Sequence, residues 1–153
     1  MADFVHLTNK TEYSLSEGAL PIARIAELCQ SFSMPAVGIS DNNNMFGALE
    51  FSEQIAKVGV QPILGCNIKI KTPKEYLHEN IEDNDLYFYL NIFSKNNEGY
   101  ENLLKCVSNA YTLNKGNACV TVDDLIKLKE GLIILSGGNN SILTHSTGHM
   151  ITK

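Results

Sequence analysis

The stretch Met34-Pro-Ala-Val-Gly-Ile-Ser-Asp-Asn-Asn-Asn-Met-Phe-Gly47 decides the fold. Its apolar run, Pro35 to Ile39, stops abruptly at a polar cluster, Ser40 to Asn44, and a helical pattern begins at Gly47. A uniformly apolar run is typical of a strand inside a parallel sheet, where both faces are covered. Proteins with α/β folds place their sites at the carboxyl ends of such strands. The polar cluster therefore marks the position at which a site is expected.

Outward from this stretch, strands and helices alternate. Apolar residues that recur at helical spacing predict helices, and continuous or aromatic-rich apolar runs predict strands. This alternation is typical of βαβ units with right-handed crossovers, which gather the loops that follow the strands on one edge of the sheet. The expected strands are residues 4–7, 36–40, 61–70, 86–93 and 131–135, and the expected helices are residues 21–33, 47–58, 98–110 and 121–129. The fold class is therefore α/β.

The number of elements limits the architecture. A closed (β/α) barrel needs about eight strands and roughly 250 residues, whereas this chain has 153 residues. The sequence thus fits either a compact open sheet or the opening part of a larger barrel. Residues 71–85 are charged and are expected to form an exposed excursion, and residues 144–153, which lack apolar periodicity, are expected to be frayed.

Composition excludes several classes of protein. The chain is 44% hydrophobic with a net charge of −5, which suits one domain with a core and argues against a free-standing nucleic-acid-binding protein. No apolar run approaches the roughly 20 residues that span a membrane, and the N-terminus lacks the apolar region of a signal peptide. The cysteines Cys29, Cys66, Cys106 and Cys119 form no Cys-x-x-Cys pair and are expected to be buried free thiols in a reducing cytosol.

A series of short segments, spread in order along most of the chain, carries a more specific signal. The segments are Phe4–Leu7, Thr11–Leu15, Gly18-Ala19, Met34–Ala36, Ser40-Asp41, Asn44–Gly47, Glu50-Phe51, Pro62–Cys66, Ser94–Leu104 and Glu130–Ile133. Together they resemble the N-terminal PHP (polymerase and histidinol phosphatase) domain of the alpha subunit of bacterial DNA polymerase III, the replicative C-family polymerase. The resemblance fades after about Leu143.

This resemblance implies a distorted (β/α) barrel, with residues 1–143 as a partial PHP domain and residues 144–153 as a tail. It implies a part in DNA replication, within a cytoplasmic DNA-directed DNA polymerase, a nucleotidyltransferase. The palm domain, whose acidic residues bind the polymerase magnesium ions, is missing, so no cofactor is expected in this chain. The implied partners are the remainder of the alpha subunit and the proofreading exonuclease subunit. DNA would be reached only through the full holoenzyme, and no membrane is involved.

Active PHP proteins hold up to three metal ions at the strand carboxyl ends, where the metals activate water and clamp phosphate. By resemblance, the ligand positions in this chain fall on Thr8, Lys10, Glu17, Asn42, Asn67, Tyr89 and Gly138, with Asp41 as an additional carboxylate nearby. Only Glu17 keeps a good ligand type. Neutral amides and a hydroxyl bind transition metals poorly, and the ammonium of Lys10 repels a cation. These positions are therefore read as a degenerate metal site, with no metal ligand and no catalytic residue.

Lys10 permits a positive hypothesis. Its ammonium could take the place of the metal by neutralising Glu17 and Asp41, and the alternative is that Lys10 is simply solvated. His6, on the first expected strand, is expected to be packed and hydrogen-bonded rather than a ligand.

Three functions stay open at this point. The leading one is a metal-free, non-catalytic PHP module with a structural and interaction role. The second is a metal-dependent PHP phosphoesterase or 3′–5′ exonuclease, so whether the chain is itself an enzyme is uncertain. The third is a non-functional remnant of a split polymerase gene.

Overall fold

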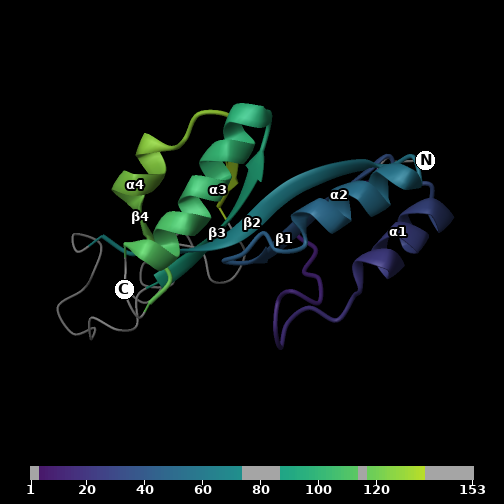
Figure 1. The fold of residues 1–153 in the computed structure, drawn as a ribbon, viewed down its shortest axis with the longest axis horizontal. Coiled ribbons are helices and arrows are strands. Elements are labelled where there is room, and N and C mark those ends of the chain that lie inside the picture. Colours follow the sequence, from purple (N-terminus) through teal and green to yellow (C-terminus); the bar gives the residue numbers. More distant parts are fainter. Residues whose placement is uncertain (1–3, 74–86, 114–116, 137–153) are drawn as a thin grey trace, which may run out of the picture.

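The structure, a computed structural model, describes residues 4–73, 87–113 and 117–136 (Figure 1). Its elements follow in the order α1 (Ile22–Ser31), β1 (Ala36–Asn42), α2 (Ala48–Lys57), β2 (Gln61–Lys71), β3 (Tyr87–Ser94), α3 (Asn97–Thr112), β4 (Val120–Thr121), α4 (Val122–Lys127) and β5 (Leu132–Leu135). The expected helices and strands from residue 21 onward are therefore present, with small shifts at their ends. Residues 144–153, expected to be frayed, and the excursion beyond residue 73 lie outside the described part of the chain.

The sheet has the strand order β1-β2-β3-β5, and the short β4 pairs with β2 beyond the end of β1. Strands β1 and β2 are parallel, with Ala36 opposite Gln61 and Asn42 opposite Asn67, and α2 is the crossover between them. This confirms the predicted βαβ unit.

Strand β3 departs from that prediction because it runs antiparallel to β2, as β5 does to β3. A parallel return needs a long crossover, usually a helix, and the charged sequence between β2 and β3 carries no helical apolar pattern. The expectation that every strand presents its carboxyl end at the same edge is thus correct for β1 and β2 and wrong for β3.

The first expected strand, residues 4–7, is not a regular strand. It runs beside β1 and is joined to it by two backbone hydrogen bonds. The amide of Gly38 donates to the carbonyl of His6 at 2.7 Å, and the amide of Ser40 donates to the carbonyl of Asn9 at 2.8 Å. His6 is exposed rather than packed, and its ring meets the edge of Phe4 at a centroid distance of 4.6 Å. The N-terminal segment (residues 4–20) therefore covers the outer edge of β1 with few backbone hydrogen bonds.

Local chemistry explains where the helices begin and end. The side chain of Asn96 accepts a hydrogen bond from the amide of Gly99 at the start of α3, and that of Thr121 accepts one from Asp124 at the start of α4. Side-chain caps at Asn96 and Thr121 thus mark where α3 and α4 begin. Helix α2 is followed by Gly59 with φ of +76°, a left-handed conformation that glycine adopts without strain.

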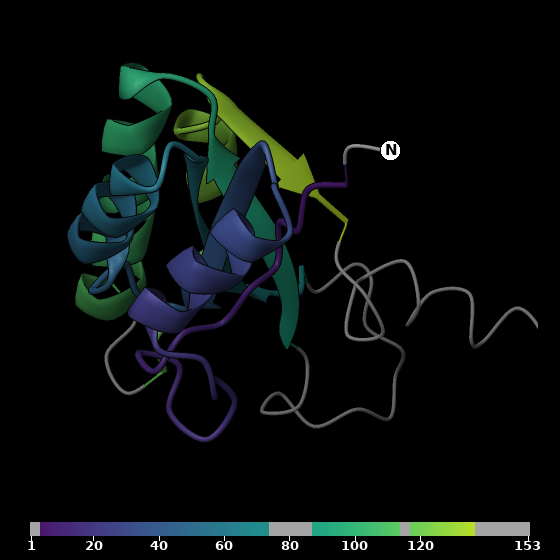
Figure 2. The ribbon, with the colours of Figure 1, turned by 90° about the vertical axis from the view of Figure 1, so that its right-hand side faces the viewer.

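Two hydrophobic clusters lie on the same face of the sheet. One joins α1 and α2 to Val37 and Ile39 of β1, and the other joins α3 and α4 to the central strands. In Figure 2 these helices lie on one side of the strands. The four cysteines are all buried, as predicted. No helix within the described ranges is long and apolar enough to cross a membrane.

Candidate functional site

The polar cluster at the end of β1 divides between the two faces of the sheet, because successive side chains of a strand point in opposite directions. Ser40 and Asn42 point away from the helices, whereas Asp41 points toward them, on the same side as its register partner Cys66. Asn42 lies opposite Asn67 of β2, which lies opposite Asn91 of β3. These three residues form an asparagine row across the face that the helices leave uncovered.

The asparagine row is incompletely hydrogen-bonded. The hydroxyl of Ser40 donates to the side-chain oxygen of Asn91. The side-chain oxygens of Asn42 and Asn67 are buried, and neither has a donor among the described residues. An unpaired buried acceptor costs about 1–3 kcal/mol, so such atoms in folded proteins call for a specific explanation. Here the two orphaned oxygens occupy positions that the PHP resemblance assigns to a histidine and a glutamate.

Lys10 and Glu17 form an ion pair beside this row. The hydrogen bond from Lys10, and then one from Asn42, hold the pKa of Glu17 below its ordinary value, and the positive charge of Lys10 adds to the effect. The Glu17 side chain is 56% exposed and that of Lys10 is 28% exposed. Lys10, Glu17 and Asn42 are thus brought together, with Asn67 opposite Asn42 on the neighbouring strand.

Asp41 has a different environment from the one predicted. Its buried carboxylate accepts hydrogen bonds from the Thr11 amide and the Thr11 hydroxyl, both at 2.7 Å, and from the Ser14 hydroxyl at 2.6 Å. Lys10 is paired with Glu17 and not with Asp41 in the described part of the chain. The proposed neutralisation by Lys10 is therefore present for Glu17, and the carboxylate of Asp41 is held by hydrogen bonds instead.

Thr11 and Ser14 are residues that sequence reasoning missed. Ser14 also accepts a hydrogen bond from the amide of Asn42 at 3.1 Å, and the Asn44 side chain donates to the carbonyl of Tyr13 at 3.1 Å. These contacts fasten the N-terminal segment onto the end of β1. The only available signal was the spacing of two hydroxyl residues three apart in a segment of the PHP resemblance, which does not specify a carboxylate thirty residues away.

Asn43 turns the chain from β1 toward α2. Its φ of +49° lies in the left-handed region that asparagine tolerates. Its side chain accepts from the amide of Lys69 at 2.8 Å and donates to the carbonyl of Ala118 at 3.0 Å. The left-handed backbone and these two side-chain hydrogen bonds let Asn43 turn the chain at the end of β1.

The remaining predicted positions are Thr8, Tyr89 and Gly138. Thr8 is exposed on the N-terminal segment. Tyr89 is half-buried in β3, opposite Lys69 and two residues from Asn91, so it lies on the polar face but farther along the strand. Gly138 lies outside the described residues.

The donor set does not fit a transition-metal centre. Over residues 4–73, 87–113 and 117–136, no group of three His, Cys, Asp or Glu side chains is placed to hold a metal ion. Glu17 is the carboxylate next to the asparagine row, and its partner Lys10 brings a positive charge to the same place. Zinc sites are built from several thiolate, imidazole or carboxylate ligands, and the described residues of this site supply fewer than three of these.

The PHP domain family matches residues 6–150. The chain is 38% identical over 135 residues to the DNA polymerase III subunit alpha of Rickettsia felis, which covers 87% of this chain and 10% of that protein. It is 32% identical over 136 residues to that of Haemophilus influenzae, over 88% of this chain and 11% of the relative. The chain therefore belongs to the PHP domain family. Its relatives are polymerase alpha subunits, of whose length it spans about a tenth.

Solved structures show the same fold. A putative metal-dependent phosphoesterase from Bifidobacterium adolescentis matches with a TM-score of 0.51 and 17% identity, over 72% of this chain and 34% of that one. An amidohydrolase from Chromobacterium violaceum matches with a TM-score of 0.51 and 11% identity, over 69% and 32% of the two chains. The predicted PHP-type α/β fold is thus confirmed.

Proposed function

We propose that this chain serves as a metal-free, non-catalytic PHP module of a replicative DNA polymerase III alpha subunit, acting in the cytoplasm. Its role is structural: it supports the remainder of the alpha subunit and offers a surface to the proofreading exonuclease subunit. It reaches DNA only through the assembled holoenzyme. The observation that carries the proposal is the ion pair between Lys10 and Glu17 beside the asparagine row.

The ion pair opposes metal binding in two ways. Glu17 would have to exchange a charged partner for the metal, and the released ammonium of Lys10 would remain close enough to repel a divalent cation. The neighbouring amide oxygens carry no charge with which to offset that repulsion. Metal-assisted hydrolysis needs a metal-bound water as nucleophile, so loss of metal removes the chemistry and leaves the fold.

Metal analysis of the purified chain tests this proposal. After incubation with Zn²⁺ and Mn²⁺ and removal of unbound metal, we expect far less than one equivalent of either metal per chain. We also expect no metal-dependent hydrolysis of a phosphomonoester or of single-stranded DNA. Near-stoichiometric metal that disappears in Glu17→Gln would overturn the proposal. Cooperative thermal unfolding of the same sample would argue against the hypothesis of a non-functional, barely folded remnant.

A metal-dependent phosphoesterase or 3′–5′ exonuclease is the second candidate, and one observation favours it. The buried oxygens of Asn42 and Asn67 have no donor among the described residues, and Asn42, which lies opposite Asn67, hydrogen-bonds to the Glu17 carboxylate. Carboxylate and amide oxygens are an all-oxygen set of the type that binds Mg²⁺ or Mn²⁺. Mn²⁺-dependent activity retained by the wild-type chain and lost in Asn67→Leu would support this candidate.

A further inference from the structure

The most exposed large apolar side chains of the described residues lie around one contact. Leu15 is 87% exposed, Phe46 is 76% exposed and Leu49 is 70% exposed. The side chain of Asn44 donates to the carbonyl of Tyr13 at 3.1 Å. Leu15 and Phe46 each follow one partner of this hydrogen bond by two residues, and two residues span at most about 7 Å. We call Leu15, Phe46 and Leu49 the apolar patch.

The backbone that carries the apolar patch is held in place. Ser14, the neighbour of Leu15, is 1% exposed, and its hydroxyl donates to Asp41 at 2.6 Å. The ring of Tyr13 lies so close to Gly47 that a Cβ on that glycine would be 2.8 Å from the Tyr13 Cδ2 atom. Apolar side chains on a fixed backbone lose less freedom when they are bound. Clustered exposed apolar side chains, rather than scattered ones, mark interaction sites.

Carboxylates surround the apolar patch. Residues 11–20 and 43–54 contain no lysine or arginine, and their acidic residues are Glu12, Glu17, Glu50 and Glu53. Glu17 is paired with Lys10, whereas the other three glutamates form no ion pair with a lysine or arginine of the described residues. The negative charge beside the patch is therefore largely uncompensated.

Tyr13 lies between the N-terminal segment and α2 and responds to these charges. Its hydroxyl donates to Glu50 at 3.1 Å, and this hydrogen bond, followed by the negative charge of Glu50, holds the pKa of Tyr13 above its ordinary value. Burial and the charges of Glu12 and Asp41 raise the pKa further. The electrostatic potential beside the patch is thus negative.

The spacing of the exposed residues suits a partner helix. Leu49 lies three residues after Phe46, and Glu53 lies four residues after Leu49, so the three follow one face of α2 and of the turn before it. Apolar side chains at this spacing form the seam along which two helices pack, and charges beside the seam select the partner. A second copy of this chain would bring like charges together, whereas lysine or arginine would pair with them.

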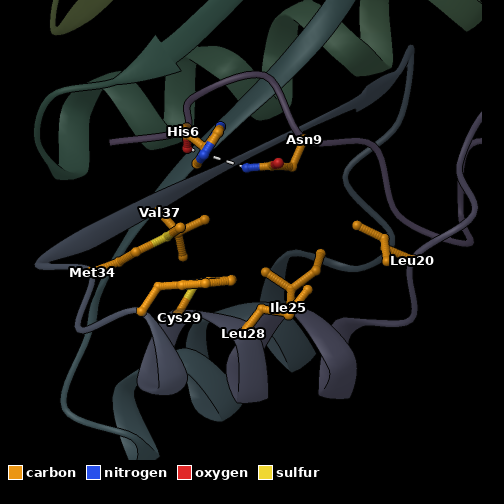
Figure 3. Close-up of a pocket in the computed structure, with 9 residues that line it drawn as sticks. His6, Asn9, Leu20, Ile25, Leu28, Cys29, Met34 and Val37 are labelled. Carbon is orange, nitrogen blue, oxygen red and sulfur yellow. Dashed lines mark hydrogen bonds between the residues drawn. The ribbon is translucent and has the colours of Figure 1, made fainter. Parts of the chain in front are cut away.

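The pocket beside α1 is an apolar surface without such charge. It has a volume of about 230 Å³, and Leu28 and Cys29 of α1 point toward the N-terminal segment that carries His6 and Asn9 (Figure 3). Phe32, which also lines it, is 67% exposed. The described residues that line the pocket include no carboxylate. It therefore offers a matched control for apolar exposure alone.

We propose that the apolar patch and its glutamates form a docking surface for a basic amphipathic helix of a partner protein. Phe46 and Leu49 pack against the apolar face of that helix, and Leu15 extends the contact from the N-terminal segment. Glu53 pairs with a lysine or arginine beside that face. The inference rests on the proposed interaction role of this chain, and it adds the surface and the chemistry of the partner.

The test uses the full chain and synthetic peptides of about 18 residues, or five helical turns. The basic peptide has leucine at the a and d positions of each heptad and lysine at the other positions. One comparison peptide has glutamate in place of lysine, and another has the residues of the basic peptide in a scrambled order without the apolar period. By fluorescence anisotropy, we expect the basic peptide to bind at least about tenfold more tightly than either comparison peptide.

Substitutions in the patch locate the binding. Phe46→Ala and Leu49→Ala should each weaken binding of the basic peptide about fivefold or more, because each removes an apolar anchor. Glu53→Gln should weaken binding and reduce its dependence on salt. Phe32→Ala, at the pocket in Figure 3, and Glu130→Gln, at an exposed glutamate between α4 and β5, are the matched controls and should leave binding unchanged.

Equal binding of the basic peptide and either comparison peptide would overturn the inference, as would binding that Phe46→Ala and Leu49→Ala leave unchanged. All the substituted side chains are exposed, and circular dichroism establishes that each variant remains folded. None of the substitutions alters Lys10, Glu17 or the asparagine row. The metal content of the chain therefore judges the proposed loss of catalysis separately.

Discussion

Asn42 of β1 and Asn67 of β2 are register partners whose side-chain oxygens are both buried without a donor from the described residues. They stand at positions where active PHP domains are expected to carry metal ligands. A buried acceptor without a partner opposes folding, and no described side chain compensates for it. We therefore propose that the pair is a remnant of a metal site, in keeping with the proposed loss of catalysis.

Removal of one of these unpaired side-chain oxygens should not lower the free energy of unfolding. We expect Asn67→Leu to leave the free energy of unfolding unchanged or to raise it by about 1 kcal/mol, because an unpaired polar atom is replaced by apolar volume. Asn91→Leu is the matched control, since its side-chain oxygen accepts a hydrogen bond from Ser40, and it should destabilise the protein. Urea unfolding of both variants gives the comparison. A larger loss for Asn67→Leu than for Asn91→Leu would show that Asn67 has a partner.

Restoration of ligand types should restore metal binding. The fourfold variant Thr8→His, Lys10→His, Asn42→His, Asn67→Glu supplies imidazoles and a carboxylate beside Glu17 and removes the repelling ammonium. We expect it to bind Zn²⁺ at least about 100-fold more tightly than the wild-type chain, by isothermal titration. The same variant with Lys10 retained is the control and should bind more weakly. Equal affinity of the wild-type and fourfold variants would mean that these positions do not form the ancestral site.

Asp41 should be the most sensitive polar residue of the polar cluster. Asp41→Ala leaves the Thr11 amide and the Thr11 and Ser14 hydroxyls without their acceptor, so we expect a loss of about 3 kcal/mol or more in the free energy of unfolding. Asp123→Ala, at an exposed aspartate in the first turn of α4, should cost less than about 1 kcal/mol. Chemical denaturation at pH 7 measures both. Similar losses would argue against a structural role for the Asp41 network.

The Lys10–Glu17 pair should contribute a small stability that depends on pH. Glu17 has a lowered pKa in the folded state, so its pairing stabilises the protein above the ordinary glutamate pKa of 4.5 and is lost as the pH falls through the folded value. For a partly exposed pair we expect at most about 1 kcal/mol. A double-mutant cycle with Lys10→Met and Glu17→Gln at pH 7 and at pH 2.5 measures the coupling. Coupling that persists at pH 2.5 would contradict an ion pair.

The fold was predictable wherever apolar residues recur at helical spacing or form a continuous run typical of a strand. The apolar run before the polar cluster, the helical spacing through Phe51 and Ile55, and Gly59 after that helix together specified the β1–α2–β2 unit. The antiparallel return of β3 was missed, because the direction of a strand depends on the connection rather than on the strand's own residues. Strand β4 was missed because its two residues are too few to show an alternation of apolar and polar side chains.

The sequence predicted which residues lie at the site, but it did not predict all of their hydrogen-bond partners. Resemblance to the PHP family placed Lys10, Glu17, Asn42 and Asn67 at one site, and the structure brings those four together. The pairing of Asp41 with Thr11 and Ser14 could not be read from the sequence. Successive side chains of a strand point to opposite faces of the sheet. A shift of one residue therefore decides whether a carboxylate lies on the face of the Lys10–Glu17 pair or on the face that the helices cover.

The attachment of the N-terminal segment has a consequence for motion. The Asp41 carboxylate holds the Thr11 amide and both nearby hydroxyls, while two backbone hydrogen bonds join residues 6–9 to β1. Because this segment forms no regular helix or strand of its own, we expect it to open locally at a lower free energy than the sheet, once the Asp41 network and the packing of Tyr13 against the α1–α2 cluster are broken. Hydrogen exchange at the amide of Thr11 would report that local opening, whereas exchange at Ile68 in the buried centre of β2 would report complete unfolding.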